Sequence, residues 1–286
     1  MLPSFIVAGI MKSGTTYLDN LIRRHPQILM PERSMDLSFF DNDEIWKNGI
    51  SWYEKAFIPF EEMVGVVGQT SADCAFNPGS IERIKNTIPD VKLIFVIRHP
   101  IDRLYSHYWH QVSMGREIYS FENVIEYESS RVKKNYYNFK MYSYLARSKY
   151  ASQFENVYRH FEKKNVMIIP FELLTTNEFN LLNLVFDFLG VDKIKNINEV
   201  KSETTKKNKA SIPQNRLAIK IAYGLQKFGM VGASRNFLNR FRMEQKPPEM
   251  KLATRGKLEQ LLKSDLIFYH EILDEYKLKL KDKSVY

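Results

Sequence analysis

The sequence lacks several features that would each place the chain in a class of protein. Its 286 residues include a single cysteine, Cys74, which excludes an intramolecular disulfide and a cysteine metal cluster. Such low cysteine content is typical of a reducing compartment, so we expect a cytoplasmic protein. No run approaches the ~20 apolar residues of a membrane-spanning helix, and no integral membrane segment is expected. The first residues, MLPSFIVAGI, lack a basic region and a cleavage site, which predicts a buried strand there and not a signal peptide.

Acidic residues are scarce in one part of the chain. The whole sequence has 42 Lys and Arg against 33 Asp and Glu, a net charge of +9. Residues 201–257 hold 14 of the basic and 3 of the acidic residues, a balance of +11 that leaves −2 for the remainder (9 minus 11). A basic surface attracts polyanions such as nucleic acid, anionic lipid, a phosphorylated cofactor or a sulfated or uronic polymer. A solvated lysine-rich surface would give the same count, so both interpretations stay open.

Apolar segments alternate with amphipathic ones along most of the chain, which is 44% hydrophobic. Strands are expected at residues 4–9, 64–69, 91–97 and 165–171. Helices are expected at 14–25, 77–89, 100–114, 121–130, 138–163, 178–190 and 252–281, with weak periodicity between 193 and 252. Strands that alternate with helices predict βαβ units and a parallel sheet. We therefore expect an α/β domain with a central parallel sheet flanked by helices.

The segment GIMKSGTT, residues 9–16, directly follows the first expected strand and resembles a phosphate-binding loop in its spacing. In G-x-x-x-x-G-K-[ST] the lysine follows the second glycine and reaches the terminal phosphates of a nucleoside triphosphate. Here Gly9 and Gly14 have that spacing, but Thr15 stands at the lysine position and the lysine is Lys12. Backbone N–H groups at a helix N-terminus bind anions, and Ser13, Thr15 and Thr16 would add hydroxyl donors. The segment thus predicts an anion site.

The most apolar strand, residues 91–97, ends at Arg98. A metal-dependent nucleotide hydrolase needs an acidic residue at such a strand end. Because Thr16 then has no acidic partner there, no metal is expected. Two cations, Lys12 and Arg98, instead suit a ligand with two separate anionic ends.

These residues resemble those of a known family. MKSGTTYL, residues 11–18, resembles the 5′-phosphosulfate loop of sulfotransferases that use 3′-phosphoadenosine 5′-phosphosulfate (PAPS). VIRHPIDRLYSHYWH, residues 96–110, resembles their 3′-phosphate motif R-x-P-x-x-R-x-x-S-x-Y, with Arg98, Pro100, Arg103, Ser106 and Tyr108 at the matching positions. The resemblance covers residues 3–191, is nearest to the Golgi-type carbohydrate (heparan-sulfate-like) branch and its bacterial relatives, and extends only loosely to the C-terminal third.

The resemblance implies a P-loop-like three-layer fold, a single sulfotransferase domain over residues 1–286, and sulfuryl transfer from PAPS to an acceptor hydroxyl, with a glycan or glycolipid as the expected acceptor. It assigns the 5′-phosphosulfate to Lys12, Ser13, Gly14, Thr15 and Thr16, the 3′-phosphate to Arg98 and Ser106, and the face of the nucleotide to Lys206, Lys207 and Asn208. Arg103 is either a further ligand or a structural residue. The core would lie at about 3–191, followed by a basic and helical part at about 192–286; the oligomeric state stays open.

The catalytic base is sought in PERSMDLSFFDND, residues 31–43. Heparan-type relatives carry a glutamate two residues before a histidine and then Phe-Phe; here Asp36 and Ser38 stand before Phe39 and Phe40. Asp36 is therefore the candidate base, with Glu32 in reserve, and a capping role is the alternative for Asp36. Lys12 is expected to stabilise the leaving 5′-phosphate. The aromatic residues Phe39, Phe40, Trp46, Trp52 and Tyr53 are either core or a platform for sugar rings.

Two differences from the relatives keep other functions open. Relatives often carry a lysine in a GEKS stretch, but this chain has Thr70 there, and it also lacks the histidine at Ser38. A PAPS-binding protein without turnover is thus one alternative. A P-loop kinase or nucleotide hydrolase with an atypical loop is another, although Lys12 and Arg98 are misplaced for it. The sequence has no helix-turn-helix, zinc-finger or RNP signature, so no nucleic-acid partner is expected.

Overall fold

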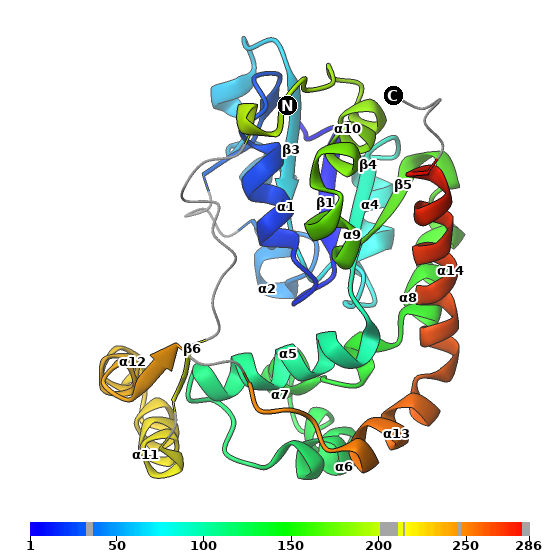
Figure 1. Ribbon diagram of the computed structural model, residues 1–286. Helices are drawn as coiled ribbons and strands as arrows, with labels where there is room; N and C mark the ends of the chain where they lie inside the picture. The colour runs from blue at the N-terminus through cyan, green and yellow to red at the C-terminus, as the bar shows by residue number, and fades with distance from the viewer. Residues whose placement is uncertain (33–36, 201–210, 214, 245–246, 282–286) are drawn as a thin grey trace. The chain divides into compact units, whose positions relative to one another are not determined.

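Figure 1 presents the computed structural model of the chain, which describes residues 1–32, 37–200, 211–213, 215–244 and 247–281. These residues divide into two compact units. Unit 1 takes the described parts of Met1–His99, Tyr150–Lys206 and Ser264–Tyr286, and unit 2 takes those of Pro100–Lys149 and Lys207–Lys263. A single domain over residues 1–286 therefore stays a prediction.

A parallel sheet lies at the centre of unit 1. Its described strands have the order β2-β3-β1-β4-β5, and every neighbouring pair is parallel. The strands are β1 (Phe5–Gly9), β2 (Ile28–Leu29), β3 (Val66–Thr70), β4 (Lys92–Ile97) and β5 (Val166–Pro170). Four of them are the strands that the sequence predicts. The addition is β2, whose two residues are too few to form an alternating pattern.

Helices cover both faces of this sheet. One face carries α1 (Thr15–Ile22), α9 (Phe171–Thr176) and α10 (Glu178–Leu189), and the other carries α4 (Ser80–Thr87) and α8 (Tyr150–His160). Figure 1 shows α1, α9 and α10 in front of the sheet and α4 behind it. Each face has its own hydrophobic core. Because successive strand residues point to opposite faces, Val7 packs in the core beneath α1, α9 and α10, and its neighbours Ile6 and Ala8 pack in the core beneath α4 and α8. The predicted three-layer α/β architecture is confirmed.

A glycine in the middle of β3 makes room for an aromatic ring on β1. Phe5 and Gly68 are partners in the register of the two strands, and the Phe5 side chain is fully buried. A Cβ atom added to Gly68 would lie 2.1 Å from the Cε1 and Cζ atoms of Phe5. Gly68 therefore allows the Phe5 ring to lie against the backbone of its neighbouring strand.

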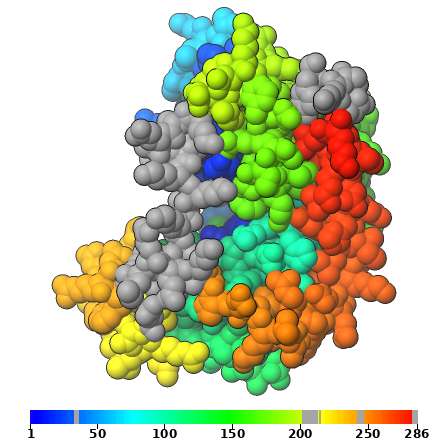
Figure 2. Space-filling view, in the orientation of Figure 1, coloured from blue at the N-terminus to red at the C-terminus, as the bar shows by residue number. Residues whose placement is uncertain are grey.

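The last long helix, α14 (Lys263–Lys279), packs on unit 1 at the edge strand β5. Its Tyr269 belongs to one core and its Tyr276 to the other, so the helix crosses from one face of the sheet to the other at this edge. In the space-filling view α14 appears as a red surface beside the green of α9 and α10 (Figure 2). Covering the edge strand in this way protects it from pairing with another chain.

Three of the five aromatic residues considered between β2 and β3 belong to the core. The helices between these strands are α2 (Asp43–Trp46), α3 (Ile50–Glu54) and a 3-10 turn at Ile58–Phe60; further 3-10 turns of unit 1 lie at Lys163–Asn165 and Ile197–Glu199. Phe39, Phe40 and Tyr53 are fully buried, and the ring centroids of Phe39 and Tyr53 are 4.7 Å apart. These three rings therefore cannot stack on a ligand, whereas Trp46 and Trp52 are only partly buried.

Unit 2 is mostly helical. It contains α5 (Pro100–Ser113), α6 (Phe121–Val132), α7 (Tyr136–Tyr142), a 3-10 turn at Ala146–Ser148, α11 (Arg216–Lys227), α12 (Val231–Asn239) and α13 (Leu252–Leu261), with an antiparallel pair of short strands, β6 (Ser211–Pro213) and β7 (Arg242–Glu244). Within the described ranges of both units, no helix has the length and apolar composition that a membrane crossing requires.

The expectation of one helix over residues 138–163 is wrong. The helical stretch is interrupted after α7 because a buried arginine of α5 donates hydrogen bonds to the connecting segment. Arg103 is fully buried, and it donates from Nε to Ser148 Oγ at 2.7 Å and from an Nη to the carbonyl oxygen of Tyr144. A continuous helix would use that carbonyl for its own ladder. Arg103 therefore has a structural role, one of the two that its position in the motif allows.

Candidate active site

The chain between β1 and α1 forms a tight loop that ends at the start of a helix. The N–H of Ile10 donates to the carbonyl of Val96 on β4 at 2.9 Å, and the N–H of Ser13 donates back to the carbonyl of Ile10 at 3.0 Å. Lys12 and Gly14 both have left-handed backbones, with φ of 69° and 101°. Gly14 is the N-cap of α1, so this loop presents the positive end of the helix dipole.

The hydroxyl of Ser13 stands out inside this loop. The residue is fully buried, and its Oγ has no hydrogen-bond partner in the described part of the chain. A buried polar atom without a partner costs free energy, ~1–3 kcal/mol, and native proteins rarely leave one unless a water, ion or ligand completes it. A phosphate or sulfate oxygen at the N-terminus of α1 would complete it.

Phe171, the first residue of α9, joins the loop to the end of β4. A Cβ atom added to Gly14 would lie 2.3 Å from the Cδ2 atom of the Phe171 ring. The guanidinium carbon of Arg98 lies over the same ring, 5.5 Å from its centroid. One aromatic ring thus sets the position of the loop and of the arginine. The sequence pattern did not single out Phe171, because both contacts join residues far apart in the chain.

Arg98 follows β4 and is half-buried. Its carbonyl accepts the hydroxyl of Tyr150 at 3.0 Å, and the next N–H, that of His99, donates to Oε1 of Glu172 at 3.2 Å. Its guanidinium makes no ion pair with any described carboxylate, which keeps the charge available for an anion. The strands β1 and β4 are neighbours; the strands that follow β1 (β2 and β3) lie on one side of this pair in the sheet order, and β5, which follows β4, lies on the other. Such a switch point at the carboxyl ends of strands is where α/β folds bind ligands.

Other predicted residues lie in unit 2 or outside the described residues. Ser106 lies on α5 and is half-buried. On the same helix His107 is buried with its ring centroid 4.6 Å from that of Tyr144, a packing role. The candidate base Asp36 and the basic residues Lys206, Lys207 and Asn208 fall in segments that the structure does not describe.

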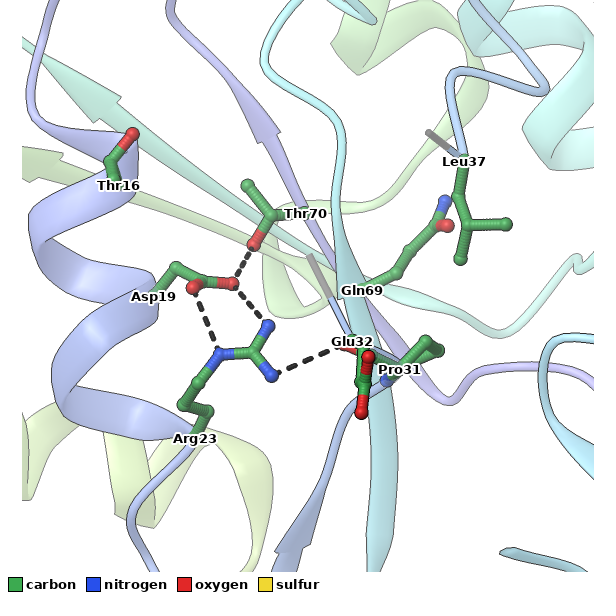
Figure 3. Close-up of a pocket in the computed structure, with 8 residues that line it drawn as sticks. All are labelled: Thr16, Asp19, Arg23, Pro31, Glu32, Leu37, Gln69 and Thr70. Carbon is green, nitrogen blue, oxygen red and sulfur yellow. Dashed lines mark hydrogen bonds and ion pairs between the residues drawn. The ribbon is translucent and has the colours of Figure 1, made fainter. Parts of the chain in front are cut away.

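A cavity of about 160 Å³ adjoins the loop in unit 1. It is lined by Thr16, Asp19 and Arg23 of α1, by Pro31, Glu32 and Leu37, and by Gln69 and Thr70 at the end of β3. Figure 3 shows these side chains around the opening. Thr16, the last residue of the predicted anion loop, is therefore also part of this cavity wall.

One wall of the cavity is a closed polar network. The carboxylate of Asp19 accepts from Nε and an Nη of Arg23, both at 3.1 Å, and from Oγ1 of Thr70 at 2.7 Å. The other Nη of Arg23 donates to the carbonyl of Pro31 at 3.2 Å. Figure 3 shows the guanidinium held between the carboxylate and this carbonyl. Thr70 stands where relatives often carry a lysine, and here it donates to a carboxylate.

Neither a metal centre nor a reactive thiol emerges from the described residues. No group of three or more His, Cys, Asp and Glu side chains lies close enough to hold a metal ion in that part of the chain. Cys74 is fully buried, and burial raises the pKa of its thiol well above the usual value. Thiolate chemistry at neutral pH is therefore not supported at this residue.

Comparisons with known proteins agree on one family. The profile of the sulfotransferase domain family matches residues 2–266. The membrane-associated sulfotransferase kil1 of Dictyostelium discoideum is 34% identical over 136 residues, which are 45% of this chain and 28% of that protein. The mouse heparan sulfate glucosamine 3-O-sulfotransferase 5 is 29% identical over 196 residues, 66% of this chain and 54% of that protein. The chain thus spans about half, or less, of the length of these curated relatives.

A solved structure has the same architecture. The sulfotransferase from Alicyclobacillus acidocaldarius is 25% identical, with a TM-score of 0.57 over 84% of this chain and 96% of that chain. This likeness agrees with the parallel sheet and flanking helices of unit 1.

Proposed function

This chain belongs to the sulfotransferase domain family, and on that premise we propose that it transfers a sulfuryl group from PAPS to a hydroxyl of a carbohydrate acceptor. The observation that carries the proposal is the buried, unpartnered hydroxyl of Ser13 in the loop before α1. An anion oxygen would complete its hydrogen bonding, and it lies at the sheet position where this fold class binds nucleotides.

The residues present fit PAPS, which would supply the sulfuryl group. In the proposal the loop residues Lys12 to Thr16 hold the 5′-phosphosulfate, and Arg98 and Ser106 hold the 3′-phosphate. Lys206, Lys207 and Asn208 are proposed to lie over the nucleotide. Support comes from the separation of the cations: Lys12 follows β1 and Arg98 follows β4, as a ligand with two anionic ends requires.

The proposed reaction is an in-line displacement. A bond forms between the acceptor oxygen and sulfur, the bond from sulfur to the 5′-phosphate oxygen breaks, and the acceptor proton passes to a carboxylate. Asp36 is proposed as that base, with Glu32, which is exposed on the cavity wall, as the reserve. Lys12 and the N-terminal amides of α1 would stabilise the charge on the leaving phosphate. None of these roles requires a metal ion.

The acceptor class and the compartment are part of the proposal. A carbohydrate acceptor is supported by the heparan sulfate sulfotransferases among the relatives. We place the reaction in the cytoplasm because the chain has one cysteine. Fractionation of expressing cells is the check, since one relative is named as membrane-associated.

Calorimetric titration with 3′-phosphoadenosine 5′-phosphate, with ADP and Mg-ATP as comparison ligands, tests the donor site. We expect tight binding of the bisphosphate alone and a loss of about 2–3 kcal/mol in Arg98→Ala, because a charge-assisted hydrogen bond is removed. That loss corresponds to roughly a 30- to 150-fold weaker affinity. Arg159→Ala is the matched control, since Arg159 is an exposed arginine of α8 paired with Glu155.

Two results would contradict the proposal in different ways. Preference for Mg-ATP, or an Arg98→Ala variant that binds as well as the wild type, would favour a P-loop kinase or hydrolase. Bisphosphate binding without sulfuryl transfer to any carbohydrate in a radiolabelled PAPS assay would leave a PAPS-binding protein without turnover.

A further inference from the structure

Gln69 is a second buried polar side chain without partners, and it lies on the wall of the cavity beside the anion loop. The residue is 2% exposed, and neither Nε2 nor Oε1 has a hydrogen-bond partner in the described residues. Figure 3 shows its amide turned toward Leu37, away from the network of Asp19 and Arg23. An amide in this state offers one acceptor and two donors to whatever enters the cavity.

The rest of the cavity wall does not favour an anion. Arg23 is the only cation among the described lining residues, and it is already bound to Asp19 and to the carbonyl of Pro31. Glu32 adds a second carboxylate, so the lining residues that the structure describes carry a formal charge of −1. A carboxylate or sulfate in this cavity would meet like charge in a partly desolvated site, which is costly. An uncharged polar group would not meet this repulsion.

The size and position of the cavity restrict the occupant further. Its volume is about 160 Å³, and a cavity of ~150 Å³ accepts a six-membered ring. Its wall includes Thr16, so an occupant lies next to the loop that is proposed to hold the transferred group. We propose that this cavity is an acceptor subsite for one uncharged, hydroxyl-bearing ring, in which Gln69 is the specificity-determining contact. This inference rests on the proposed function and adds to it the charge of the acceptor unit.

The unsatisfied amide of Gln69 should lower the stability of the folded protein. Gln69→Leu removes an amide that the folded protein leaves unsatisfied, so we expect an unchanged or higher melting temperature. The matched control is Gln27→Leu on the segment before β2. The Gln27 amide donates to Asp192 Oδ2 at 3.0 Å and accepts from the Asp192 N–H at 2.8 Å, and Gln27 is outside the cavity lining. Gln27→Leu should therefore lower the melting temperature and leave acceptor use unchanged.

The activity test compares acceptors of equal length with radiolabelled PAPS. The probes are neutral disaccharides (lactose and N-acetyllactosamine) and a disaccharide that carries a glucuronate. We expect transfer to at least one neutral probe at ten times or more the rate for the glucuronate probe. Gln69→Leu should lower kcat/KM for the neutral probe at least thirtyfold, and Gln69→Glu should lower it as well. Affinity for 3′-phosphoadenosine 5′-phosphate should change less than twofold in both variants.

A second measurement does not depend on turnover. In ¹⁵N-labelled protein the side-chain amide signal of Gln69 is assigned by its loss in Gln69→Leu, and it should shift when the neutral disaccharides are added. Preference for the glucuronate probe, or a Gln69→Leu variant with unchanged kcat/KM, overturns the inference while the donor site stands. If the wild type binds no bisphosphate and transfers no sulfuryl group, the proposed function fails, and the amide signal then decides alone: a shift supports the subsite and no shift overturns it.

Discussion

The contact between Gly14 and Phe171 allows a prediction with a worked magnitude. Gly14→Ala brings two costs: an alanine at φ 101° is strained by ~1–2 kcal/mol, and its Cβ would stand 2.3 Å from the Phe171 ring, an overpacking cost of ~1–3 kcal/mol. The substitution should therefore destabilise the protein by about 2–5 kcal/mol. Only the second cost involves the ring.

Removing the ring should separate the two costs. In a Phe171→Ala background the added methyl group meets no ring, so Gly14→Ala should cost only the backbone strain of about 1–2 kcal/mol. Gly190→Ala is the control, because Gly190 also has a left-handed backbone, with φ of 80°, but nothing lies within 4 Å of an added Cβ. Its cost should be about 1–2 kcal/mol in both backgrounds.

Urea unfolding of the four proteins of the cycle, with the two control variants, measures these differences from midpoints at a common slope. We expect a coupling free energy of about 1–3 kcal/mol between positions 14 and 171. Costs that add within ~0.5 kcal/mol would show that the ring does not confine the loop, and the structural reasoning would fail. Phe171→Ala should also weaken bisphosphate binding by about 0.5–2 kcal/mol, since Arg98 loses the ring beneath its guanidinium.

Two further predictions concern buried titratable groups. Cys74 is buried with a raised thiol pKa, so a thiol reagent such as Ellman's should label the native protein at the rate of unfolding, and fast labelling in the absence of urea would contradict its burial. In unit 2, Glu128 accepts the N–H groups of Leu145 and Ala146 at 2.6 and 2.9 Å, and burial raises its pKa above the usual 4.5. The folded state then holds this proton where the unfolded state has lost it, so wild-type stability should fall relative to Glu128→Gln as pH rises through the window just above 4.5. Parallel stability curves for the two proteins would refute this.

The loop and the strands could be predicted because their signals are local. The apolar run before Arg98 and the spacing of Gly9 and Gly14 lie within short windows. Because these residues follow neighbouring parallel strands, they lie together at the carboxyl ends of those strands. Phe171 could not be assigned, because its contacts with Gly14 and Arg98 depend on how β5 pairs with β4. The interruption before α8 likewise depends on Arg103, which lies on a helix distant in sequence and donates to the Tyr144 carbonyl.

Helices α11 and α12 show a different limit of sequence reasoning. The sequence predicts no element there, yet residues 216–227 and 231–239 are helical. Leu217 and Ile221 of α11 are exposed, while Ala218, Ile219 and Ala222 are buried. The apolar periodicity of α11 is nevertheless strong enough to predict a helix, so the expectation of no element there is an error of interpretation.

Gly68 and Phe5 have an evolutionary consequence. With 2.1 Å between an added Cβ and the ring, any side chain at position 68 is blocked while phenylalanine occupies position 5. Mutational paths through this pair are therefore ordered: position 5 must first become smaller, and only afterwards is position 68 released from glycine. Descendants of this sequence should explore the two positions as one unit, although they lie 63 positions apart in the sequence.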